Sequence, residues 1–180
     1  GNIVSLIQSI YEGFGSGIAA EGAGFMLHNR GALFSLEDGH PNVLAPRKRP
    51  LHTIIPGFMK RDRVAIGFGI MGGWNQAQAH AQFVSNIVDY DMDIQQALEA
   101  GRFTKPTFDG RDVLIEALVP ESVRNELIAL GHDVTVVPPR TGTFGSGQAV
   151  MSREGVHFGA SEPRHDGAAI PEAPPVFDSM

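Results

Sequence analysis

The sequence contains no cysteine among its 180 residues. Disulfide bonds, thiolate catalysis and cysteine-ligated metals are therefore all excluded. The absence does not fix the compartment, because a chain without cysteine suits the cytosol and the periplasm equally. The sequence also has no apolar run near the roughly 18 residues that span a bilayer, so we expect no membrane partner.

Basic charge is not concentrated anywhere along most of the chain. The net charge is −6, and the basic residues are scattered except at Arg47–Arg49. A nucleic-acid partner would require a concentrated basic face, so we expect none. The cluster at Arg47–Arg49 is typical of a solvated turn, with a small-anion site as the alternative.

Several catalytic and metal-binding motifs are missing. No GxSxG nucleophile elbow, P-loop or GxGxxG fingerprint occurs, which argues against a serine hydrolase of that kind and against nucleotide binding. The seven histidines show no HExxH spacing. Asp89, Asp91 and Asp93 lack the glycine and glutamate spacing of a calcium loop, so helix ends explain them better. We expect no metal and no other cofactor.

The hydrophobic pattern predicts a single α+β or layered α/β domain over residues 1–180, with an irregular tail from residue 162. The predicted strands are 2–10, 23–28, 51–58, 64–70, 112–118, 133–137, 146–151 and 155–159. Residues 29–49 form a long turn-rich loop, and such loops are often functional. Helices are predicted over 74–90, over 93–100 with Asp93 as N-cap, and from Pro120 to a stop at Gly131.

Two of the predicted helices carry apolar stripes at a spacing of three and four residues. The stripe of the first helix consists of Trp74, Ala77, Ala81, Val84 and Val88. The stripe of the third helix consists of Val123, Leu127 and Leu130.

Gly72 and Gly73 are the most informative local feature. They stand between an apolar strand and an amphipathic helix, which puts consecutive backbone N–H groups at the positive end of the helix dipole. Such a place suits an anion or the oxyanion of an acyl-transfer intermediate. A plain strand-to-helix turn is the alternative that spacing alone leaves open.

The chain begins without an initiator methionine or a signal peptide. Gly1-Asn2 enters a strand-like run almost at once, so we expect a processed or truncated chain. A signal could lie upstream, which leaves the location open between the cytoplasm and the periplasm or exterior.

Five co-linear segments together resemble one family. They read GNIVSLIQSIYEGFGSG, KRPLHTIIP, MGGWNQAQAHAQ, ES…LIALGHDV and GASEPRHDGAA. This order is similar to that of the gamma-glutamyltransferases (gamma-glutamyltranspeptidases), and most to the bacterial gamma-glutamyltransferase-like branch. The resemblance covers the chain from Gly1 to about Ala169, which is the small-subunit portion of such proteins.

The resemblance implies an N-terminal-nucleophile hydrolase, with a four-layer αββα sandwich made as a self-cleaving precursor. Cleavage exposes a threonine whose hydroxyl attacks a gamma-glutamyl amide, with its own α-amino group as the base. That threonine should lie about one strand upstream of Gly1, so the chain alone should be inert. The large subunit of the same precursor is the implied partner, and no cofactor is implied.

The resemblance also assigns roles to particular residues. Gly72 and Gly73 match the oxyanion-hole glycines, and Ser9 matches a hydroxyl residue that supports the nucleophile. Tyr11, Arg30 and Leu33 occupy positions where the better-known enzymes bind the glutamyl α-ammonium with an Asn, an amide-bearing side chain and an Asp. His52 and Thr53 replace the paired serines that hold the α-carboxylate.

These replacements leave the acyl group open. Arg30 adds a permanent cation, which would penalise an ammonium if it faces the pocket. The first interpretation is gamma-glutamyl transfer or hydrolysis, on glutathione or related amides. A glutaryl- or cephalosporin-type acylase would suit Arg30 better, and Arg30 pointing to solvent is the alternative. A non-catalytic binding fragment is the interpretation from a different functional class.

Overall fold

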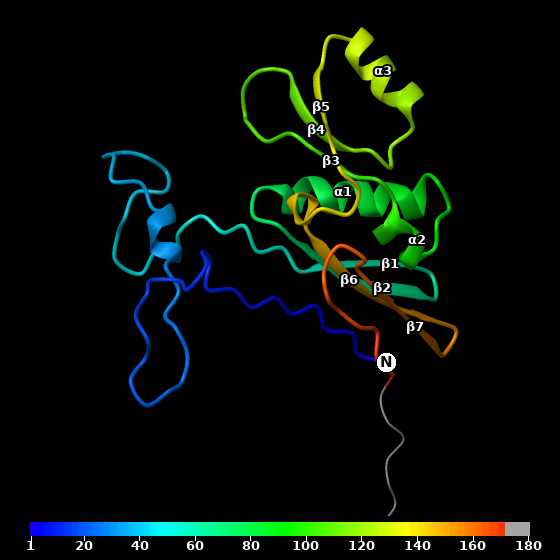
Figure 1. The fold of residues 1–180 in the computed structure, drawn as a ribbon. Coiled ribbons are helices and arrows are strands. Elements are labelled where there is room, and N and C mark those ends of the chain that lie inside the picture. Colours follow the sequence, from blue (N-terminus) through cyan, green and yellow to red (C-terminus); the bar gives the residue numbers. More distant parts are fainter. Residues whose placement is uncertain (172–180) are drawn as a thin grey trace, which may run out of the picture. The chain divides into compact units, whose positions relative to one another are not determined.

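The computed structural model describes residues 1–171 and divides the chain into two compact units (Figure 1). One unit combines Gly1–Leu6 with the chain from Ile55 onward, and the other is Ile7–Ile54. The single domain over residues 1–180 stays a prediction, and the part of the predicted tail beyond residue 171 lies outside the described residues.

An antiparallel sheet of four strands forms the base of the first unit (Figure 1). Its order is β1-β2-β6-β7, with bounds Gly57–Arg61, Val64–Met71, Ser146–Arg153 and Val156–Ser161. Two helices lie against it: α1 is Asn75–Val88 and α2 is Ile94–Glu99. The N-cap predicted at Asp93 is confirmed, since its carboxylate accepts from the Gln95 and Gln96 N–H groups, and the Gln96 side chain completes a capping box.

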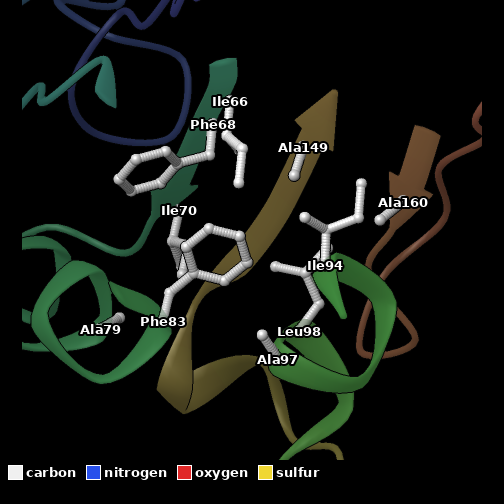
Figure 2. Packing of buried hydrophobic residues seen from close by; sticks show 10 residues of the cluster. All are labelled: Ile66, Phe68, Ile70, Ala79, Phe83, Ile94, Ala97, Leu98, Ala149 and Ala160. Atoms are coloured by element: carbon white, nitrogen blue, oxygen red, sulfur yellow. The ribbon is translucent and has the colours of Figure 1, made fainter. Parts of the chain in front are cut away.

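The hydrophobic core lies between this sheet and the two helices (Figure 2). Alternate β2 residues Ile66, Phe68 and Ile70 point towards the helices, as expected for a strand with one buried face. Phe83 of α1 lies with its ring centroid 4.8 Å from that of Phe68. Leu98 of α2 is fully buried on the same side. The sheet and helices therefore share one packed interior.

The span predicted for the first helix is confirmed, but its apolar stripe is not the buried face. Trp74 and Val88 are both more than half exposed, whereas Ala79 and Phe83 are buried. Gln76 and His80 lie on the same buried face. Because these side chains are polar, the spacing of apolar residues does not predict which face is buried. Burial of these two polar side chains is possible because each accepts a hydrogen bond from a backbone N–H, of Ile55 and Ile70 respectively.

Glutamine side chains join the helices to strand edges. Gln78 of α1 accepts from the Lys105 N–H and donates to the Lys105 carbonyl, and Gln82 pairs in the same way with Phe103. Gln95 of α2 makes both bonds to Ser161. Each carboxamide thus satisfies one backbone donor and one backbone acceptor, of Phe103 in β3, of Lys105 just after it and of Ser161 in β7.

A smaller sheet follows, with order β3-β4-β5. Its strands are Phe103–Thr104, Asp112–Glu116 and Asp133–Val137. Helix α3 (Glu121–Ala129) connects the parallel strands β4 and β5. The helix predicted from Pro120 starts one residue later, with Pro120 as its N-cap, and the stop at Gly131 is confirmed, with φ +90°. The apolar stripe of α3 is not buried, because no α3 residue is buried in the described chain.

Three predicted strands differ from the structure. Residues 2–10 form no ladder, although the Ser5 hydroxyl donates to the Phe68 carbonyl at 2.7 Å. Residues 23–28 contribute a single bridge, Ala19 to Met26. The strand predicted over 51–58 begins only at Gly57, because Pro56 has no N–H to donate to a ladder.

The second unit has little regular structure, as the turn-rich composition of residues 29–49 predicted. A 3₁₀ turn, η1, covers Arg30–Leu33, and one parallel bridge joins Ser35 and Val43.

A buried ionic quartet ties the first unit together. Glu116 of β4 pairs with Arg164, Arg164 pairs with Glu162, and Glu162 pairs with Arg102. The predicted irregular tail therefore starts in the interior, since Glu162 and Arg164 are buried. Two cations and two anions cancel, and backbone groups satisfy further donors and acceptors. Burial would raise the Glu116 pKa, but hydrogen bonds from Arg164 and the Arg102 N–H lower it overall.

Glu116→Gln should strongly destabilise the protein, because it keeps the shape but leaves Arg164 without one of its counter-charges. The cost of breaking a buried pair is about 3–5 kcal/mol. Denaturant unfolding of the intact protein measures it. Asp112→Asn is the matched control, since its pair with Lys105 is partly exposed, and it should have a much smaller effect. Equal effects would contradict a special role for the quartet.

His80 should make stability depend on pH. Burial lowers the pKa of His80, so the folded state keeps the imidazole neutral and able to accept the Ile70 N–H. The unfolded state binds the extra proton first, so this contribution is complete above about pH 6.5 and is lost as the pH falls through and below that value. His80→Gln keeps an acceptor that does not titrate. Melting temperatures from pH 8 to 5 should fall less in His80→Gln than in the parent protein.

Candidate active site

The Met71–Trp74 bend leads from β2 into α1 through two positive φ angles. Gly72 has φ +140° and Gly73 has φ +58°, conformations that side chains rarely adopt. Their carbonyl groups accept the first N–H bonds of the helix, from Asn75 and Gln76. Within residues 1–171, neither glycine N–H donates a hydrogen bond to the protein. Both amides are therefore available to an acceptor at the positive end of α1.

Gly145 supports this bend from the side. It has φ +80°, and a Cβ on it would overlap the Met71 carbonyl oxygen. A Cβ on Gly72 would lie 3.1 Å from the Gly145 Cα. The Arg102 guanidinium donates to the Phe144 and Gly145 carbonyls, at 3.1 Å each. The buried quartet thus fixes the backbone against which the glycine pair rests.

Arg30 organises a second cluster, within the unit Ile7–Ile54. Its guanidinium donates from Nη2 to the Ser9 hydroxyl at 2.9 Å and from Nη1 to the Thr53 hydroxyl at 3.2 Å. The same group lies 4.9 Å from the centroid of the Tyr11 ring, within cation–π range. Tyr11 adopts φ +78°, an uncommon conformation for a bulky residue. Four of the predicted site residues are therefore in contact through Arg30.

Arg30 does not point to solvent, so that alternative is wrong: the residue is only 3% exposed. Among residues 1–171 no carboxylate forms a salt bridge with it. Its only hydrogen bonds there from the guanidinium are the two to hydroxyls, which leaves three of the five N–H donors of an arginine without a protein acceptor. A buried cation without a counter-charge is costly, and an anion that bonded to the free donors would lower that cost.

The remaining predicted site residues, His52 and Leu33, are not among the side chains that the Arg30 guanidinium contacts. His52 is exposed, and Leu33 is half-buried. An open pocket of about 570 Å³ is lined by residues 8–13, which include Ser9 and Tyr11. The catalytic roles of Gly72, Gly73 and Ser9, and the substrate-binding roles of Tyr11, Arg30, His52 and Thr53, stay predictions.

Sequence reasoning missed the residues that support the Gly72–Gly73 bend. They are Arg102, Glu116, Glu162 and Arg164. The charged Glu-Pro-Arg triplet at residues 162–164 was a usable signal, because two charges there interrupt an otherwise small-residue segment. Composition predicts only an irregular tail there.

None of the helices within residues 1–171 has the length and apolar character that crossing a bilayer requires. No group of three or more acidic or histidine side chains in that part of the chain is arranged to hold a metal ion.

Replacing Gly145 by alanine should damage the bend. Gly145→Ala combines left-handed strain with the overlap at Met71, whereas Gly155→Ala, at φ +81° with no atom near its Cβ, carries the strain alone. We expect Gly155→Ala to cost about 1–2 kcal/mol and Gly145→Ala clearly more, measured as unfolding free energy. A Gly145→Ala cost no larger than that of Gly155→Ala would show that the contact is loose.

The chain is similar to one protein family and to curated members of related function. The family model described as gamma-glutamyltranspeptidase matches residues 1–172. The glutathione hydrolase-like YwrD proenzyme of Bacillus subtilis is 36% identical over 94% of this chain. The oxamate amidohydrolase proenzyme of Klebsiella pneumoniae is 34% identical over the same share. The chain spans about 33% of the length of each of these curated relatives.

Solved structures are also similar to this chain. The cephalosporin acylase from Bacillus halodurans superimposes with a TM-score of 0.82 at 42% identity, over 90% of this chain and 30% of that one. Solved gamma-glutamyltranspeptidases share the fold. The predicted fold class, the small-subunit part of an N-terminal-nucleophile hydrolase, is therefore confirmed. The named relatives are proenzymes, and the chain corresponds to their small-subunit region.

Proposed function

The chain belongs to the gamma-glutamyltranspeptidase family, and from that premise we propose that the intact protein cleaves amides whose acyl group ends in a carboxylate, which Arg30 binds. The nucleophile in this proposal is an N-terminal threonine, freed upstream of Gly1 when a precursor cleaves itself. The large subunit from that precursor is the proposed partner.

The proposed chemistry is an acyl transfer in two steps. The threonine oxygen attacks the amide carbon and its proton passes to the threonine α-amino group, while the carbonyl electrons move onto oxygen. Gly72 and Gly73 donate to that oxyanion. When the carbonyl re-forms, the C–N bond breaks and the amine leaves with the proton. Water, or an amino group in the case of transfer, then attacks the acyl carbon and gives a proton to the threonine α-amino group. The ester C–O bond breaks, and the threonine oxygen takes that proton as the acyl product leaves.

The observation that supports this substrate class is the burial of Arg30 without a carboxylate partner in the described chain. An isolated buried charge costs several kcal/mol, so it is unfavourable until an anion arrives. Guanidinium and carboxylate match as a two-bond fork, and Arg30 keeps free donors for such a pair. Ser9 and Thr53 hold the group in place.

A glutaryl-type acyl group fits this cation better than a gamma-glutamyl group. Both carry a carboxylate, but gamma-glutamyl adds an ammonium that Arg30 would repel. Leu33 stands where the resemblance implies an acidic partner for that ammonium. Oxamate, named for one relative, is also an amide with a carboxylate and no ammonium.

Gamma-glutamyl transfer or hydrolysis is the second candidate. It is favoured by the relative named glutathione hydrolase-like, at 36% identity. In that case the large subunit would supply the counter-charge to the ammonium.

The decisive measurement compares three p-nitroanilides: glutaryl, gamma-glutamyl and pentanoyl, which has a methyl group in place of the terminal carboxylate. The intact precursor is first incubated until it splits into two polypeptides. We expect glutaryl to be the best substrate. In Arg30→Met, kcat/KM for glutaryl should fall about 100-fold, as for a lost charge-assisted hydrogen-bonded pair, while pentanoyl changes little.

Arg49→Met is the matched control, because it removes the same charge from an exposed position of the same unit. It should leave all three rates unchanged. Arg30→Met should also melt no lower than the parent protein, since it removes a buried charge that no carboxylate of the described chain neutralises. A strong preference for gamma-glutamyl in the parent protein would reject the glutaryl assignment. A precursor that never splits would reject the enzyme itself in favour of a binding protein.

A further inference from the structure

Asn75, the first residue of α1, has a buried carboxamide with nothing to bond. The residue is 7% exposed, and neither its Nδ2 nor its Oδ1 has a hydrogen-bond partner among residues 1–171. A buried amide in that condition costs about 1–3 kcal/mol. Native proteins rarely keep such a group unless it has a ligand or a function.

The other amide side chains of α1 are all in use. Each bonds to the backbone of another segment: Gln76 to Ile55, Gln78 to Lys105, Gln82 to Phe103, and Asn86 to Ala97. These contacts hold the helix against its neighbours. Asn75 makes no such contact within the described chain, so attachment of the helix does not explain it.

The position of Asn75 connects it with the glycine bend. Its Nδ2 lies 3.5 Å from the place that a Cβ on Gly72 would occupy. The Gly72 and Gly73 N–H groups are also without acceptors in residues 1–171. Unpaired donors of a side chain and of two backbone amides therefore meet at the start of one 14-residue helix, where the dipole favours negative charge.

We propose that Asn75 is a third donor of the oxyanion site, with its Nδ2–H group bonding to the oxygen that becomes negative when the nucleophile attacks. The inference rests on the proposed function and adds a catalytic residue to it. The charge on that oxygen appears as the new C–O bond forms and disappears as the C–N bond breaks. A donor placed there strengthens its bond only in the transition state, so it raises kcat and leaves KM largely unchanged.

The test uses the intact, self-processed protein with Asn75→Ala and Asn75→Asp. Four quantities are measured: kcat, KM, the melting temperature, and the inhibition constant of a boronic acid that carries the preferred acyl group. The boronic acid forms an anionic tetrahedral adduct with a hydroxyl nucleophile. In Asn75→Ala we expect a drop of about 100-fold in kcat, an equal loss of boronate affinity and little change in KM. Asn75→Asp should lose at least as much, because its carboxylate repels the oxyanion.

Asn86→Ala is the matched control on the same helix. It breaks a hydrogen bond that the structure shows, so it should lower the melting temperature while leaving kcat and boronate affinity unchanged. Asn75→Ala should melt no lower than Asn86→Ala. If Asn75→Ala does not fold, Asn75→Asp, which keeps the shape, carries the test alone.

The outcomes separate this inference from the proposed function. A parent protein that neither splits nor cleaves any of the three anilides rejects the proposed function. A parent that is active, with Asn75 variants that keep both kcat and boronate affinity, rejects the role of Asn75 alone. Loss of stability without loss of kcat would likewise assign Asn75 to structure and overturn the proposal.

Discussion

The buried quartet of Arg102, Glu116, Glu162 and Arg164 is the interaction on which the first unit depends. Glu116 ends β4, Arg102 precedes β3, and Glu162 and Arg164 follow β7. Their carboxylates and guanidinium groups also bond to backbone groups of other segments. Complete pairing is what makes such charges tolerable in an interior. Because Arg102 also holds Gly145, the quartet determines the shape of the bend at Gly72 and Gly73.

Arginine serves two opposite purposes in this chain. Arg102 and Arg164 are neutralised by glutamates and stabilise the fold, whereas Arg30 is buried against two hydroxyl groups with no carboxylate among the described residues. The same contrast holds for the amides of α1. Four of them bind backbone, and Asn75 binds nothing in that part of the chain. Unpaired polar groups, rather than apolar hollows, mark the two candidate recognition sites.

Local signals explain which elements were predictable. The carboxylate of Asp93 and the amide of Gln96 start α2 through bonds that reach only three residues along the chain, and the glycine after α3 ends that helix in the same local way. Residues 2–10 have the composition of a strand, but a strand also needs a neighbour with free backbone groups. In the described chain the Ser5 hydroxyl bonds to the Phe68 carbonyl and the Ile10 carbonyl accepts the Asn29 N–H, but no ladder forms.

Sequence reasoning alone predicted the family, the fold class, the approximate spans of the helices and the glycine bend that precedes α1. Tertiary structure alone decided which face of α1 is buried, that Arg30 lies inside rather than in solvent, and which glutamates neutralise Arg102 and Arg164. The reason is one of range. Caps, turns and periodicity act within a few residues, whereas Arg102 meets Glu162 across 60 residues and Arg164 meets Glu116 across 48, and only the folded chain brings such partners together.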